Sequence, residues 1–222
     1  MVRLDGVQIL VEQGLPLPTG YSLVTPMVGQ TAGVSAGSGH FSWDNVQMKN
    51  HLNVDLLGNP GFESALLSTG TGTATGNFRP NVSGLSTAGR VTSPVQSGSW
   101  AGDTSAAAGG GVGYIFQDVA ESFVDVDELT LTLNLDLYRH SGGYQDALIM
   151  FDWDRGIGHY IAATRLRIDP SVIQTEIFGV YGSLPLSVTS GVWHHLEISI
   201  YFNTYTAPTL GERWAPGFAF AH

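Results

Sequence analysis

The chain of 222 residues is 43% hydrophobic and only 13% charged, so it can bury a large core but offers little to a charge-laced helical surface. Its 9 Lys and Arg stand against 19 Asp and Glu, and the resulting formal charge of -10 repels polyanions, which excludes nucleic acid as a partner. The lack of cysteine excludes disulfides and thiolate metal sites, and no apolar run approaches the roughly 20 residues that span a bilayer, so no membrane insertion is predicted.

In chain order, the first break in the pattern lies at residues 49–58 (KNHLNVDLLG), between N-terminal strands and a long remainder. Residues 63–67 (ESALL) predict at most one short helical turn. Residues 68–76 and 105–113 consist of small residues that bury little and tolerate positive φ, so both are predicted to be loops.

The second half of the chain shows a clear strand period. At residues 128–138 (ELTLTLNLDLY) every second residue is leucine, which places Leu131, Leu135 and their partners on one face of a half-buried strand. Similar runs predict further strands at residues 147–153, 159–168, 171–180 and 193–202. Many short strands divided by turns predict an all-β fold: an antiparallel β-sandwich of the jelly-roll or concanavalin-like kind, with little helix.

Four phrases carry a family resemblance. Residues 56–63 (LLGNPGFE) read as a turn leading into a first strand, residues 95–101 (VQSGSWA) precede a core strand, and residues 114–119 (YIFQDV) match an aromatic-x-x-Gln-x-Val strand. These three resemble jelly-roll carbohydrate-binding modules. Residues 191–204 (GVWHHLEISIYFNT) are similar to the Trp-His-x-Leu-x-Ile strand of laminin-G-like and concanavalin-like sandwiches.

The resemblance implies an unusual order of parts along the chain. In those families the last of these strands runs into an Asp-Gly hairpin and a closing strand, which here resemble residues 3–7 (RLDGV) and 41–48 (FSWDNVQM) instead. A sandwich without closing strands exposes an unpaired edge and an apolar face. We therefore expect residues 2–48 to pair with strands of residues 53–204, either in the same chain as a circularly permuted module or in a neighbouring chain.

The predicted domain organisation follows from this order. It comprises a closing hairpin and last strand (1–48), a linker (49–58), a main β-sandwich (59–204) and a C-terminal tail (205–222).

A structural Ca²⁺ site is implied by the resemblance. Asp44 follows Trp43 in the closing strand, Glu63 ends the opening turn, and in similar modules these two places approach each other and supply oxygen ligands. Carboxylate oxygens suit this hard ion. The alternative is that no ion binds, that Glu63 is simply an acidic residue of a turn, and that Asp44 faces solvent.

Aromatic side chains near polar loops are candidates for stacking on sugar rings. Tyr144 lies in the loop of residues 141–146 (SGGYQD), beside Arg139, His140 and Gln145, which could hydrogen-bond to hydroxyl groups. Trp100 is a second candidate, whereas Trp193 and Phe151 are expected in the core, as each aromatic residue more often is. His194 and His195 are adjacent, so a strand sends them to opposite faces and no metal site is predicted there.

Asp152 and Asp154 flank Trp153, so on an extended strand both carboxylates point to one side. Such a pair could contact a sugar hydroxyl or a cation or serve acid–base chemistry, but it also fits a polar strand end before a turn. The Glu-x-Asp-x-x-Glu strand of related sandwich glycosidases is absent from the sequence. We therefore predict that the protein is not an enzyme.

Three functions remain in order of preference. The first is a non-catalytic glycan-binding or surface-attachment sandwich, whose partner is a polysaccharide or surface glycan. The second is a structural subunit, such as a virion decoration or fibre protein, that uses the same fold in a homo-oligomer or larger assembly. The third is a sandwich-fold glycosidase or lyase. The first two imply an extracellular or virion-surface location, although the N-terminus shows no signal peptide.

Overall fold

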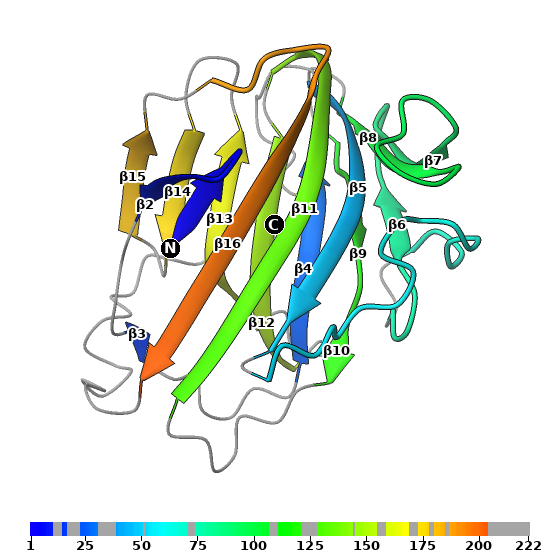
Figure 1. Ribbon diagram of the computed structural model, residues 1–222. Helices are drawn as coiled ribbons and strands as arrows, with labels where there is room; N and C mark the ends of the chain where they lie inside the picture. The colour runs from blue at the N-terminus through cyan, green and yellow to red at the C-terminus, as the bar shows by residue number, and fades with distance from the viewer. Residues whose placement is uncertain are drawn as a thin grey trace.

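Two β-sheets packed face to face form the fold, as the computed structural model shows (Figure 1). The structure describes residues 1–10, 15–16, 23–30, 39–50, 52–70, 74–106, 111–120, 128–143, 145–154, 159–168, 173–177, 180–184 and 187–203. These ranges contain no helix, and accordingly none that is long and apolar enough to cross a membrane. The predicted all-β, antiparallel sandwich with little helix is confirmed.

Sheet A has eight strands, and all neighbours are antiparallel apart from one short parallel pair. In spatial order its strands are β2 (Val7–Leu10), β1 (Val2–Leu4), β16 (Trp193–Asn203), β11 (Glu128–Gly142), β5 (Gly39–Lys49), β8 (Ala101–Ser105) and β7 (Thr87–Val91), and β3 (Leu15–Pro16) pairs with β16.

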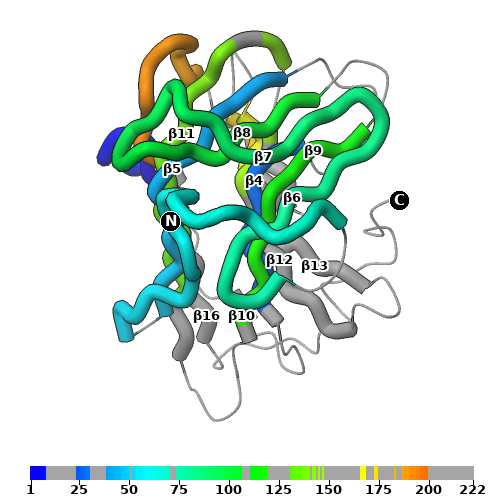
Figure 2. The backbone as a smooth tube through the Cα atoms, turned by 90° about the vertical axis from the view of Figure 1, so that its right-hand side faces the viewer, coloured from blue at the N-terminus to red at the C-terminus, as the bar shows by residue number. Residues whose placement is uncertain are grey.

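Sheet B also has eight strands. In spatial order they are β15 (Val180–Leu184), β14 (Ile173–Ile177), β13 (His159–Ile168), β12 (Gln145–Asp154), β4 (Leu23–Gln30), β9 (Gly113–Phe116) and β6 (Arg79–Val82), and β10 (Val119–Ala120) pairs with β4. Residues 52–70 and 74–91 run along one edge of the sandwich, and the chain passes from β6 in sheet B to β7 in sheet A (Figure 2).

The core lies between the two sheets, and the strand period explains its composition. On β11, Leu131, Leu133, Leu135 and Leu137 are completely buried, as the alternation predicts. Each buried side chain of this size stabilises the fold by about 1.5–3 kcal/mol relative to exposure. The bulkiest fully buried side chains are Trp43, Phe41, Phe62, Phe78 and Phe116.

A β-bulge in β5 changes which of its residues face the core. Asn45 and Val46 together lie opposite Leu135 of β11, so β5 carries one extra residue. Asn45 has a φ of 50°, a left-handed conformation that asparagine tolerates. Odd-numbered residues such as Trp43 are buried before the bulge, and even-numbered residues such as Met48 are buried after it.

A buried chain of hydrogen bonds joins the two sheets. The indole Nε1 of Trp43 donates to the hydroxyl of Thr104 at 2.7 Å, and that hydroxyl donates to the amide oxygen of Gln145 at 3.0 Å. The amide nitrogen of Gln145 donates to the carbonyl of Gly39 at 3.1 Å. Because buried polar groups are costly when unpaired, this complete chain fixes β12 against β5 and β8.

The N-terminal strands pair with later strands of the same chain. β1 lies beside β16, β5 lies between β11 and β8, and β4 lies between β12 and β9. The expected pairing of residues 2–48 with later strands is therefore confirmed, and it is intramolecular. The Asp5-Gly6 hairpin between β1 and β2 is also present, with φ values of 48° and 78° that suit a two-residue turn.

Two predicted boundaries differ from the structure, whereas the predicted linker 49–58 stays a prediction. In this segment Leu52 and Val54 are 68% and 52% exposed, while Leu57 is 7% exposed and the N–H of Leu56 bonds to the carbonyl of Met48. The predicted strand 171–180 contains β14 and only the first residue of β15, which continues to Leu184 and pairs with β14. The predicted loop 141–146 is shorter, because β11 continues to Gly142 and β12 begins at Gln145.

Candidate functional site

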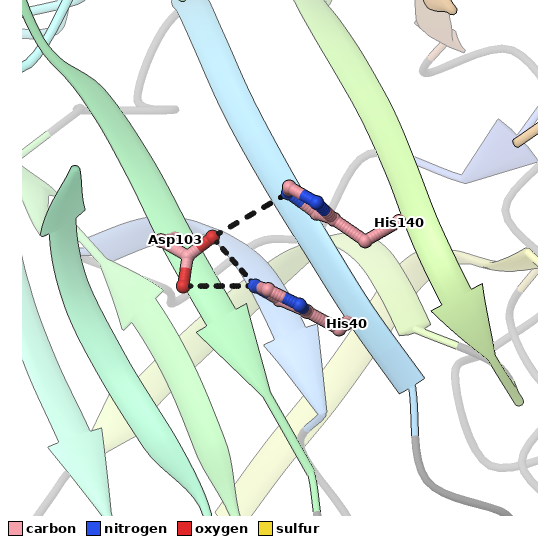
Figure 3. A group of neighbouring side chains, drawn as sticks. All are labelled: His40, Asp103 and His140. Atoms are coloured by element: carbon pink, nitrogen blue, oxygen red, sulfur yellow. Dashed lines mark hydrogen bonds and ion pairs between the residues drawn. The ribbon is translucent and has the colours of Figure 1, made fainter. Parts of the chain in front are cut away.

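The outer face of sheet A, turned away from the core, carries a group of polar side chains from three neighbouring strands. His40 comes from β5, His140 from β11 and Asp103 from β8, and all three point toward one another (Figure 3). We call them the His–Asp cluster. A second bulge places His140, because β11 carries one extra residue between Arg139 and Ser141 opposite β5. Bulges re-aim side chains in this way.

Short contacts connect the His–Asp cluster. The Nε2 of His40 lies 3.0 and 3.2 Å from the two carboxylate oxygens of Asp103, and the Nε2 of His140 lies 3.9 Å from Oδ1 (Figure 3). The buried hydroxyl of Ser42 lies between them, 2.9 Å from Asp103 Oδ1 and 2.8 Å from His140 Nε2. The two imidazole rings stack at 3.9 Å and are within 9° of parallel.

The protonation of His140 is set by its surroundings. Burial lowers its pKa, the neighbouring His40 lowers it further, and the charge of Asp103 only partly opposes these effects. A histidine with a lowered pKa is neutral at pH 7, and a neutral ring has a nitrogen lone pair to offer.

Aromatic rings extend from the cluster across sheet A. His140 meets the ring of Tyr138 edge-on at 4.9 Å, and Tyr138 meets Trp193 of β16 at 5.5 Å. With the stacked His40, four rings therefore lie in sequence over β5, β11 and β16; we call them the aromatic row. Each of the four is only partly buried.

A second polar group lies beside the aromatic row. Asp136 of β11 accepts a hydrogen bond from the side-chain amide of Asn45 at 2.7 Å and contacts Nδ1 of His195 at 2.7 Å. The bulge that gives Asn45 its left-handed backbone thus also directs its side chain to the neighbouring strand.

The side chains of His194 and His195 contact different carboxylates, those of Asp5 and Asp136 respectively. Asp5 contacts Nδ1 of His194 at 2.7 Å and accepts the backbone N–H of His195 at 2.8 Å. Burial alone would raise the pKa of Asp5, but the hydrogen bonds and the charges of both histidines outweigh it and lower this pKa.

Asp44 is fully buried and holds a loop through both carboxylate oxygens. Its Oδ1 accepts the N–H of Asn45 at 2.7 Å, and its Oδ2 accepts those of Gln96 and Ser97 at 2.9 Å each. Burial raises the pKa of Asp44, the three N–H bonds oppose the rise, and the nearby charge of Asp136 adds to it.

Glu63 and Trp100 lie on the other side of the same loop. Glu63 Oε1 accepts the N–H of Ser99 at 2.8 Å and that of Trp100 at 3.2 Å. Gly98 has a φ of 65° and passes so close that a Cβ there would lie 2.0 Å from Glu63 Oε1. The guanidinium of Arg90 lies 4.0 Å above the Trp100 ring, so this indole has an internal cationic partner.

Asp44 and Glu63, the predicted calcium ligands, already have hydrogen-bond partners within the protein. The two side chains flank Gly61, but their oxygens already accept backbone N–H groups of the loop. The carbonyls of Phe62 and Glu63, which could have joined an oxygen cage, each accept a hydrogen bond from Arg90 at 3.1 Å. Arg90 thus supplies positive charge beside Glu63, and calcium binding stays a prediction of the resemblance.

Two residues predicted to bind a glycan have internal roles. Gln145 is completely buried in the hydrogen-bond chain between the sheets. Arg139 donates to the carbonyls of Val188 and Gly142 and so ties the segment before β16 to the end of β11. Of the three polar residues predicted beside Tyr144, namely Arg139, His140 and Gln145, His140 points onto the outer face of sheet A (Figure 3).

For Asp152 and Asp154 the structure describes only the backbone, and it does not describe Tyr144 at all. Asp152 and Asp154 belong to β12, where a bulge lies between them, and their side chains are outside the described part of the structure. A bulge changes the strict alternation on which their predicted common side rested. Tyr144, the predicted anchor, lies outside the described residues.

Trp193 is the main functional candidate that the sequence reading missed. It was expected in the core, but the structure leaves it partly exposed on the outer face, against Tyr138. Leu196 and Ile198 are buried among the residues of β16 whose side chains are described, so the alternation assigns position 193 to the other face. The strand period of residues 193–202, counted from Leu196 and Ile198, therefore predicts that Trp193 lies on the outer face.

Comparisons with models of known families, with curated proteins and with solved structures find no match for this chain.

Proposed function

We propose that the protein binds glycans on the outer face of sheet A and does not cleave them. The observation that carries the proposal is the aromatic row, four partly exposed rings over three neighbouring strands. The apolar C–H face of a sugar stacks on such rings, and a row of them suits a chain of sugars better than a single one.

Polar groups beside the row support the same function. Asp103 and Asp136 offer carboxylate oxygens, and the side chain of His195 is 50% exposed. These groups can accept or donate hydrogen bonds to sugar hydroxyls at the edge of a stacked ring. The resemblance of residues 56–63, 95–101 and 114–119 to jelly-roll carbohydrate-binding modules points to the same class of ligand.

The expected affinity is modest. A few stacked rings and hydrogen bonds, after the cost of association, support a dissociation constant on the order of micromolar to millimolar for one site. Useful attachment at this affinity requires several copies, which fits an extracellular homo-oligomer or larger assembly.

Affinity electrophoresis against a panel of polysaccharides tests the proposal. Trp193→Ala should abolish retention, while loss of its contact with Tyr138 lowers the unfolding free energy by only about 1 kcal/mol. Leu85→Ala is the matched control, because Leu85 is 83% exposed in a distant turn and should leave retention unchanged. Tyr144→Ala, measured in parallel, shows whether the predicted loop contributes.

Three outcomes would contradict the proposal. Retention that survives Trp193→Ala removes the aromatic row from binding. Release of reducing sugar from any polysaccharide of the panel makes the protein an enzyme. If no glycan is retained by the native protein, the structural subunit of a virion or surface assembly becomes the better account.

A further inference from the structure

We propose that the His–Asp cluster is a binding site for a divalent transition-metal ion such as Zn²⁺. One ring nitrogen of each histidine and a carboxylate oxygen of Asp103 all lie within 4.8 Å of one another, and the three side chains point toward one another (Figure 3). No other such group of His, Asp and Glu side chains is found among the described residues. The proposal does not depend on glycan binding.

The distances between the donor atoms are close to those of a zinc site. Zinc binds imidazole nitrogen and carboxylate oxygen at about 2.0–2.2 Å, so neighbouring ligand atoms of a tetrahedral site are roughly 3.3 Å apart. His40 Nε2 and Asp103 Oδ1 are already 3.0 Å apart, and His140 Nε2 and Asp103 Oδ1 are 3.9 Å apart. An imidazole nitrogen binds a metal in the plane of its ring, and the two rings are stacked within 9° of parallel. The rings must therefore tilt toward a common point, and their stacking is lost when an ion binds.

The backbone holds these three positions firmly. Asp103 faces Ser42 directly across the β5–β8 pair, and the β11 bulge fixes His140 beside the same residue. The hydroxyl of Ser42 lies 2.9 Å from Asp103 Oδ1 and 2.8 Å from His140 Nε2, the same two atoms that would bind the ion. An ion at Nε2 therefore replaces the contact between His140 and Ser42, while Ser42 can keep its hydrogen bond to the carboxylate of Asp103.

The chemistry of the donors selects the metal. Two imidazoles and one carboxylate suit zinc, copper or nickel, whereas Ca²⁺ prefers oxygen ligands alone. A site with three protein ligands leaves a coordination position for water or another small ligand. The side chain of His40 is 40% exposed and that of His140 24%, so an ion can enter from solvent.

Isothermal titration of chelator-treated, untagged protein with ZnCl₂ tests the proposal. We expect saturable binding of one ion, with proton release seen as a dependence of the heat on the buffer. His40→Ala and Asp103→Asn should each weaken binding at least about tenfold, as loss of a ligand costs no less than loss of a supporting group. His195→Ala is the matched control on the same face and should bind zinc as the native protein does.

A second measurement avoids substitution altogether. On addition of ZnCl₂, the ring proton resonances of two of the 7 histidines, His40 and His140, should shift in the NMR spectrum of the native protein. The proposal is overturned if zinc does not bind saturably, if His195→Ala weakens binding as much as His40→Ala, or if the resonances of other histidines shift instead. Glycan retention is measured without zinc, so failure of one proposal leaves the other standing.

Discussion

Asp44 and Glu63 both accept backbone N–H groups of the loop of residues 95–100, but they differ in burial and in the number of oxygens they use. Asp44 is buried and uses both oxygens, whereas Glu63 is exposed and uses Oε1 for both of its backbone contacts. An amide can replace a carboxylate only where one oxygen suffices, because its other end is a donor.

Replacing these acids by their amides should therefore have unequal effects. Asp44→Asn turns an N–H₂ group toward backbone N–H donors and should lower the unfolding free energy by about 2–3 kcal/mol. Glu63→Gln keeps its accepting oxygen and should cost less than about 1 kcal/mol. Urea denaturation of both variants measures the difference, and equal losses would show that the hydrogen bonds of Asp44 do not have the role given to them here.

Asp5 should make stability depend on pH in the acid range. Its pKa is lowered from the ordinary value of 3.8 by His194 and His195, so the unfolded chain binds this proton more tightly than the folded protein. The stabilisation is complete above about 3.8 and is lost as the pH falls through the lower folded pKa.

Asp5→Asn provides the comparison, because asparagine accepts the left-handed backbone at this position. The difference in melting temperature between native protein and Asp5→Asn should be largest above pH 4 and shrink toward pH 2. A difference that is constant over this range would mean that the Asp5–histidine contacts do not matter for stability. Subtracting the two curves removes the contribution of Asp44, whose raised pKa acts in the opposite direction.

At the scale of strands, alternation predicts faces well until a bulge interrupts it. The leucines of β11 are buried as their period requires. The His–Asp cluster could not be predicted in this way, because His40 and Asp103 are 63 residues apart and meet only through the register of β5 with β8. His140 reaches them only through a bulge, which no local pattern in the sequence indicates.

The resemblance predicts a calcium effect on the loop of residues 95–100. Binding to the folded state alone raises stability by mass action, so added Ca²⁺ should raise the melting temperature of chelator-treated protein. Asp44→Ala should abolish the rise, and His40→Ala should leave it intact. No response to Ca²⁺ would favour Arg90 and the backbone N–H groups as sufficient partners for these acids.

At the scale of the whole molecule, the fold depends on strands from the beginning of the chain. β5 lies inside sheet A and β4 lies inside sheet B, so removing them would expose both sheets internally. The place of β5 and of the β1–β2 hairpin could be predicted from sequence, because the phrases of residues 3–7 and 41–48 resemble a hairpin and a closing strand. No phrase of the sequence indicated the place of β4.

Deleting residues 1–48 should accordingly give an aggregating or molten product, because unpaired edges and apolar faces are exposed. Co-expression of residues 1–50 as a separate fragment should restore soluble protein if strand pairing is the cause. A fragment 49–222 that is soluble and unfolds cooperatively in calorimetry would contradict the structural account.

The pairing of β1 with β16 also decides when the sandwich can be completed. The N-terminal amine of Met1 bonds to the carbonyl of Ser199, 198 residues away, so this edge cannot close until almost the whole of the described chain has been synthesised. Such distant pairing carries a high loop-closure entropy and is typical of β-proteins that fold in milliseconds to seconds rather than microseconds. During synthesis β1 and β5 remain unpaired until their partner strands β16 and β11 have been made. Unpaired strand edges are the usual starting point of aggregation. The yield of native protein should therefore be governed by the rate of synthesis and by chaperones that hold the early strands apart.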